Sequence, residues 1–186
     1  MALTATIHRV EIALSDVDRN VYETLDLRVA RHPSETMRYM LTRTLGYALS
    51  FEEGIAFSKG GLSSAEEAPI SIHDPTGILL AWIDIGSPSA ERLHKASKAA
   101  RRVSVFTHVE IAALRKEAAL RPIHRAEDIQ IWKVETAFLD ALEAKIDRTT
   151  KLELVRNEGV LYATVGNAMI EGKMTLETIV DPLDRS

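Results

Sequence analysis

The most restrictive feature of this 186-residue chain is a short run of apolar residues near its middle, residues 78–83, which reads ILLAWI. The run lacks the alternation of polar and apolar side chains that is typical of a strand with one face in water. Six such residues favour a strand that is covered on both faces. Together with the helix patterns on either side of it, this run predicts an α/β fold in which helices cover a sheet.

The segments around this run alternate between helix and strand patterns. Pro33 occupies a typical first helical position, and apolar residues follow at helical spacing, which predicts a helix over residues 33–50. Ser87 and Pro88 predict the cap and first residue of a second helix, which ends near Arg102. The remaining predictions are strands at 70–72, 103–107 and 129–134, and helices at 109–120 and 135–146.

Both ends of the chain carry β patterns. Residues 6–14 and 21–30 alternate with period two around a polar turn, which predicts an N-terminal hairpin. The C-terminal region predicts strands at 151–155, 160–165 and 169–179. The sequence therefore predicts one domain over residues 1–186, with a mixed sheet flanked by helices and additional hairpins at the two ends.

Composition excludes several classes of protein. The chain has no cysteine, which removes disulfides, thiolate zinc sites and cysteine nucleophiles. No apolar run approaches the ~18 residues that a membrane span needs, and the N-terminus lacks the basic start and apolar segment of a signal peptide. We therefore expect a cytoplasmic protein that does not enter membranes. The oligomeric state stays open, and a monomer is compatible with the sequence.

The net charge of −4 is unevenly distributed. Residues 92–125 hold nine Lys or Arg and two acids, which gives +7 and leaves −11 for the remainder of the chain. This basic segment could contact a phosphate backbone, so nucleic acid is a candidate partner. The same charges could equally form solvated helix faces.

Two acids flank the apolar run and a lysine follows it. Asp74 precedes the run, Asp84 stands at its end, and Lys95 lies on the next predicted helix. Carboxylates can hold a divalent cation while a lysine steadies a phosphate. Asp74 also fits a turn-starting role in its Asp-Pro-Thr-Gly context. Asp84 needs a partner, because an acid beside an apolar strand is costly unless it is paired or metal-bound.

Three blocks of sequence resemble the bacterial YaeQ family. They are residues 30–36 (ARHPSET), the stretch from Trp82 through Asp84 and Gly86 to Pro88, and the Arg92-x-x-Lys95-Ala96 motif on the following helix. The order and spacing match over nearly the whole chain. The family usually has an Asp-Glu pair after the second proline, where this chain has Ser89-Ala90-Glu91.

The resemblance implies a variant of the PD-(D/E)xK nuclease-like fold. In that superfamily a helix supplies one acid, a strand a second, and the next strand an acid followed two residues later by lysine. Transferred to this chain, these roles fall on Glu35, Asp74 and Asp84, whereas Gly86 occupies the lysine position. In divergent members the lysine lies on the following helix, which here points to Lys95, with Lys98 and Arg92 as the alternatives.

The implied activity is Mg²⁺- or Mn²⁺-dependent hydrolysis of a phosphodiester. Asp74 and Asp84 would bind the metal, Glu35 would hold a metal-bound water, and Lys95 would orient the attacking water. Contacts with the substrate backbone are assigned to Arg31, Arg92 and Lys98. Because Gly86 replaces the lysine, a catalytically inactive fold that binds nucleic acid or a protein partner is the alternative. Glu35 could also merely favour the positive end of its helix dipole.

Overall fold

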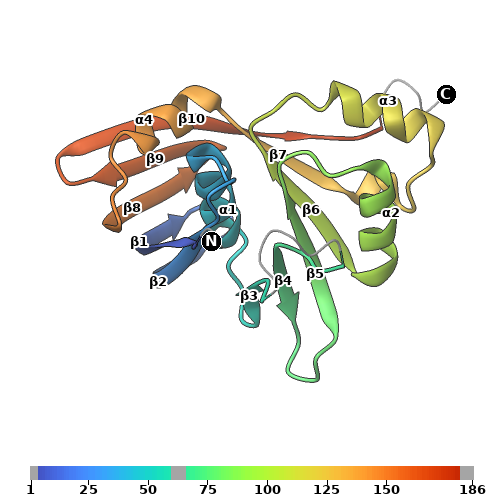
Figure 1. Cartoon of the computed structure of the whole chain (residues 1–186), viewed down its shortest axis with the longest axis horizontal. Helices are drawn as coiled ribbons and strands as arrows, with labels where there is room; N and C mark the ends of the chain where they lie inside the picture. The colour runs from blue at the N-terminus through green and yellow to red at the C-terminus, as the bar shows by residue number, and fades with distance from the viewer. Residues whose placement is uncertain (1–3, 60–65, 181–186) are drawn as a thin grey trace. The chain divides into compact units, whose positions relative to one another are not determined.

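Ten strands and four α-helices form within residues 4–59 and 66–180, the part of the chain that this computed structural model describes (Figure 1). They belong to two compact units. Unit 1 comprises Met1–Phe51 and Val134–Thr175, and unit 2 comprises Glu52–Lys133 and Leu176–Ser186. The mixed α/β fold predicted from the sequence is confirmed at this level.

Unit 1 contains five of the strands, which pair in the order β2-β1-β8-β9-β10. Strands β1 and β8 are parallel, and the other neighbouring pairs are antiparallel. The predicted N-terminal hairpin and C-terminal strands are therefore confirmed. The strands are β1 (Thr6–Asp16), β2 (Val21–Arg31), β8 (Thr149–Asn157), β9 (Val160–Val165) and β10 (Ala168–Glu177).

Helices α1 (Met37–Leu49) and α4 (Thr136–Glu143) complete unit 1, where α1 contacts β1, β2 and α4. The predicted start of α1 at Pro33 was wrong, because the helix begins four residues later. The Thr36 hydroxyl accepts a hydrogen bond from the Tyr39 N–H at 3.2 Å and caps the helix. Glu35 therefore precedes the helix.

We expect Thr36→Ala to lower the free energy of unfolding by about 1 kcal/mol. The alanine leaves the Tyr39 N–H without its side-chain acceptor, while no buried side chain is changed. Urea denaturation followed by circular dichroism measures the effect. Thr36→Ser is the control, since its hydroxyl can make the same hydrogen bond and its stability should stay close to that of the native sequence.

Unit 2 contains strands in the order β7-β6-β5-β4-β3, with β5, β6 and β7 parallel and the other pairs antiparallel. Successive residues of β5 from Ala81 to Ile85 are all buried, so both faces of this strand are covered, as its apolar run predicts. The strands are β3 (Ile55–Phe57), β4 (Ile70–His73), β5 (Leu79–Ile85), β6 (Arg102–Thr107) and β7 (Gln130–Val134).

Helices α2 (Ala90–Ala99) and α3 (Ala112–Leu120) contact each other, and α2 lies beside β5 and β6 (Figure 1). The predicted start of α2 was two residues early, because Ser89 rather than Ser87 caps the helix by accepting a hydrogen bond from the Arg92 N–H at 3.2 Å. None of the helices in the described ranges is long and apolar enough to span a membrane.

Candidate functional site

Asp84 lies near the end of β5 and is the most deeply buried of the predicted site residues in unit 2. Only 3% of the surface of Asp84 is exposed to solvent. Oδ2 accepts hydrogen bonds from Trp82 Nε1 at 3.0 Å and from Arg92 Nε at 2.6 Å, and Oδ1 accepts one from the Ile85 N–H at 3.1 Å. A buried carboxylate needs such partners, and here an arginine of the same unit supplies the positive charge.

Arg92 reaches Asp84 from the first turn of α2. Its guanidinium also donates from Nη2 to the Glu67 carbonyl at 2.9 Å. The guanidinium carbon lies 5.4 Å from the centroid of the Trp82 ring, within the range of a cation–π interaction. These contacts hold Arg92 in place over the end of β5, so the acid, the indole and the cation form one cluster.

Asp74 lies in the turn between β4 and β5. Its Oδ1 accepts from the Thr76 hydroxyl at 2.6 Å, the Thr76 N–H at 2.8 Å and the Ile78 N–H at 2.9 Å. The hydrogen bonds from Thr76 and Ile78 hold the pKa of the Asp74 carboxyl below its usual range. The geometry is that of a carboxylate that stabilises a turn.

The structure does not bring Asp74 and Asp84 together. Asp74 is bonded to Ile78 at the start of the strand, whereas Asp84 stands six residues further along. At ~3.3 Å per residue, the extended segment from Ile78 to Asp84 is about 20 Å long, and it keeps the two acids apart by about that distance. Magnesium binds its oxygen ligands at roughly 2 Å, so one ion cannot have both as ligands.

Lys95 lies on the exposed face of α2, as its position on the helical wheel predicts, and its Nζ forms an ion pair with Glu66. The hydrogen bond and charge of Lys95 lower the pKa of the Glu66 carboxyl. No sequence pattern predicts this pairing, because Glu66 lies outside the predicted elements. Lys95 is thus engaged with an acid other than Asp84.

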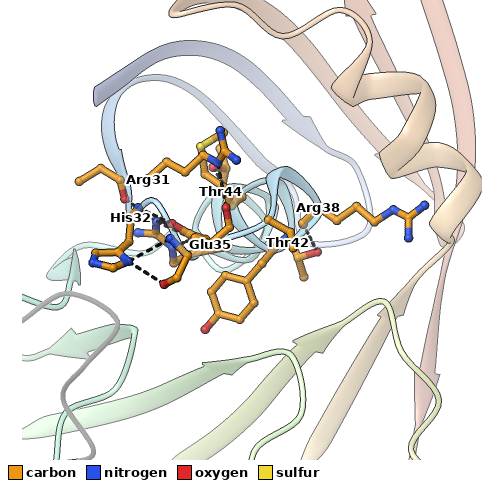
Figure 2. Close-up of polar contacts among 12 residues, drawn as sticks. Arg31, His32, Glu35, Arg38, Thr42 and Thr44 are labelled. Carbon is orange, nitrogen blue, oxygen red and sulfur yellow. Dashed lines mark hydrogen bonds and ion pairs between the residues drawn. The ribbon is translucent and has the colours of Figure 1, made fainter. Parts of the chain in front are cut away.

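Glu35 belongs to unit 1, and its carboxylate is fully engaged there (Figure 2). Only 4% of the residue is exposed. Oε1 accepts from Arg43 Nε at 3.1 Å and from Arg43 Nη2 at 2.9 Å, and Oε2 accepts from the His32 N–H at 3.1 Å. The sequence did not predict this partner, although a charge within the apolar pattern of α1 signals a buried pair.

Arg31 and Arg43 hold the backbone around Glu35. Arg31 Nε donates to the Glu35 carbonyl at 2.9 Å, and Arg43 Nη2 donates to the Ala30 carbonyl at 2.8 Å. Together with the Glu35 carboxylate, these bonds connect the end of β2 to α1. Across the described residues of both units, no group of three or more His, Cys, Asp or Glu residues could hold a metal ion.

The cations of the basic segment fall into two groups. Six are bonded to acids or carbonyls of the same unit, namely Arg92, Lys95, Arg102, Arg115, Arg121 and Arg125. The side chains of the other three, Lys98, Arg101 and Lys116, are exposed and form no hydrogen bond or ion pair in the described part of the chain, although the charge of Arg101 helps to lower the pKa of the Asp74 carboxyl. These three remain available to an anionic partner.

Comparison with known proteins gives matches over nearly the whole chain. The family model described as YaeQ protein matches residues 1–174. The Uncharacterized protein YaeQ of Escherichia coli (strain K12) is 30% identical over 176 residues, which cover 94% of this chain and 97% of the relative. The Salmonella typhi protein of the same description is 30% identical over 178 residues, with the same coverage of both chains.

Two solved structures share the fold. The crystal structure of YaeQ protein from Pseudomonas syringae matches with a TM-score of 0.83 and 29% identity, covering 94% of this chain and 96% of that one. The crystal structure of YaeQ protein from Xanthomonas axonopodis pv. citri matches with a TM-score of 0.84 and 28% identity, covering 94% of this chain and 99% of that one. The matched family model and these structures span both units.

Proposed function

The chain belongs to the YaeQ family, and from that premise we propose that it is a non-catalytic variant of the PD-(D/E)xK nuclease-like fold that binds nucleic acid. One observation about α2 carries the proposal. The helix neutralises the acid at the end of β5 through Arg92, while the side chains of Lys98 and of Arg101, just beyond the helix, are exposed and form no ion pair within the described residues.

The acids support the non-catalytic part of the proposal. A metal ion at Asp84 would have to displace Arg92, which already neutralises the carboxylate in a buried position. Asp74 stabilises a turn at the opposite end of the strand, and Glu35 is paired with Arg43. The residues at the implied Mg²⁺ or Mn²⁺ site therefore do not fit a shared ion, and Gly86 stands where the superfamily has lysine.

The exposed cations support the binding part. Lys98 and Arg101 are three residues apart, with Lys98 on the last turn of α2 and Arg101 just beyond it. The backbone turns away from the helix at the extended Ala100, and the side chains of Lys98 and Arg101 are both exposed on the two sides of this turn. Two unpaired cations there can each neutralise a phosphate without breaking an existing ion pair, and the counterions that they release give binding energy that decreases with salt.

We expect the double variant Lys98→Ala/Arg101→Ala to bind DNA and RNA oligonucleotides about tenfold more weakly at low salt. Its slope of log K against log salt should be smaller by about 2, one for each lost phosphate contact. Fluorescence anisotropy over a salt series measures both quantities. Lys151→Ala is the matched control, because Lys151 is an exposed strand cation in unit 1, outside the basic segment.

A cleavage assay decides between the two functions that the family resemblance implies, a metal-dependent hydrolase and a non-catalytic binding protein. The proposal requires that oligonucleotides remain intact with the protein in the presence of Mg²⁺ or Mn²⁺. Cleavage by the native chain that Asp84→Asn abolishes would establish the metal-dependent hydrolase instead. A native chain that binds neither DNA nor RNA at low salt would contradict the nucleic-acid proposal altogether.

A further inference from the structure

Strand β2 is an edge strand of the sheet in unit 1, and its only strand partner among the described residues is β1. The Arg9 N–H donates to the Arg148 carbonyl at 2.8 Å, so the backbone groups of Arg9 point toward β8 and away from β2. Arg9 lies opposite Arg28 in the antiparallel pair. The N–H and C=O of Arg28 therefore point to the free edge of the sheet.

A second contact agrees with this orientation. The Ala30 carbonyl accepts a hydrogen bond from Arg43, which is a helix residue and not part of the β1–β2 ladder. Because the backbone groups of alternate residues in a strand point the same way, Thr24 and Asp26 also present their N–H and C=O groups to the free edge. This row of groups is a template on which another strand can pair.

We propose that a second copy of this chain pairs with this edge, so that the two β2 strands run antiparallel around a two-fold axis at Leu27. In this register Asp26 faces Arg28 of the partner subunit, and Glu23 faces Arg31 of the partner subunit. Each pair occurs twice because of the symmetry. The apolar residues Leu25 and Val29 face each other across the axis and extend the buried side of the sheet.

Charge selects this register over its neighbours. Opposite residues of an antiparallel pair lie on the same face of the sheet. In two identical strands the numbers of two facing residues must therefore differ by an even number. The two-fold axis then passes through a residue position and not between two residues. An axis at Asp26 or at Arg28 would place two like charges directly opposite each other. An axis at Leu25 would leave Asp26 facing Thr24. Only the axis at Leu27 gives every charged residue between Glu23 and Arg31 a partner of opposite sign.

The side chains that this pairing needs are accessible. Asp26 binds Arg9 through both oxygens, at 2.9 and 2.7 Å, and both side chains are 51% exposed. The remaining lone pairs of Asp26 can accept a second arginine. Arg28 is exposed, and Arg31 uses its Nε for the Glu35 carbonyl while its terminal nitrogens can reach outward. Charges on an edge strand usually deter pairing, but this set is complementary to itself.

Sedimentation velocity over a range of protein concentrations tests the proposal. We expect the native chain to dimerise, and Arg28→Glu or Asp26→Lys to weaken the dimer by about tenfold or more, because each reversal creates two like-charge contacts across the axis. The double variant Asp26→Lys/Arg28→Glu should restore dimerisation, since it re-establishes opposite charges in the same register. Lys151→Glu, a reversal on the interior strand β8, should leave the dimer unchanged.

Three outcomes would overturn the proposal. A native chain that stays monomeric up to ~100 μM has no stable contact at this edge. A dimer that tolerates both single reversals uses another surface. Single reversals that dissociate the dimer without rescue by the double variant would exclude the axis at Leu27. Circular dichroism of every variant separates these outcomes from a loss of folding.

Discussion

Replacing Arg43 with methionine is expected to lower the free energy of unfolding by about 3–5 kcal/mol. The methionine keeps much of the side-chain volume but leaves the buried Glu35 carboxylate with the His32 N–H as its one remaining donor among the described residues. A loss of this size is a large fraction of the 5–15 kcal/mol that usually stabilises a domain. Urea denaturation of the native chain and the variant measures it.

Two controls isolate the effect of burial. Arg9→Met breaks a two-oxygen pair with Asp26, but that pair is half exposed and its loss should leave the unfolding midpoint nearly unchanged. The double variant Glu35→Leu/Arg43→Met removes both charges and should recover most of the lost stability. An Arg43→Met variant as stable as Arg9→Met would contradict the assignment of Glu35 to a structural ion pair.

The second large effect is expected for Arg92→Met, which should lower the free energy of unfolding by about 3 kcal/mol. The substitution leaves Asp84 with the Trp82 and Ile85 N–H groups but without a neutralising charge. It also removes the cation from the Trp82 ring. Urea denaturation followed by circular dichroism measures the loss.

Calorimetry with Mn²⁺ adds a readout that stability alone does not give. Because Arg92 occupies the carboxylate, the native chain and Asp84→Asn should give the same heats on titration with Mn²⁺. For the stability measurement the matched variant is Arg92→Lys, which keeps a positive charge but cannot reproduce the guanidinium geometry. Its free energy of unfolding should lie between those of the native chain and Arg92→Met. Mn²⁺ binding that Asp84→Asn abolishes would contradict the non-catalytic proposal.

Local pattern predicted most of the fold, and it failed at helix starts. The alternating and apolar runs identified nine of the ten strands, because side-chain period reflects which faces are buried. Strand β3 has three residues, too few to show a period. Pro33 and Ser87 resemble helix starts, yet Thr36 and Ser89 cap the helices. The Glu35 carboxylate accepts hydrogen bonds from Arg43, and this contact depends on tertiary packing rather than on local pattern.

The sequence identified the charged residues of the candidate site but not their partners. The position of Asp84 beside an apolar strand predicted that its carboxylate needs a partner. That this partner is Arg92 depends on how α2 packs beside β5, which the sequence pattern does not show. The separation of Asp74 from Asp84 was accessible from the sequence, because an extended strand between two residues keeps them apart. No local sequence pattern indicated that Lys95 pairs with Glu66.

The division of the chain between the units sets the order in which they can form during synthesis. Unit 2 lies mostly in one continuous stretch, Glu52–Lys133, but the central parallel pair of unit 1 joins Arg9 in β1 to Thr149 in β8. At ~5–20 residues per second, the first hairpin waits on the order of 10 s on the ribosome before β8 is made. During that interval both edges of the nascent hairpin are open, so protection by a chaperone is most valuable before the last third of the chain is translated.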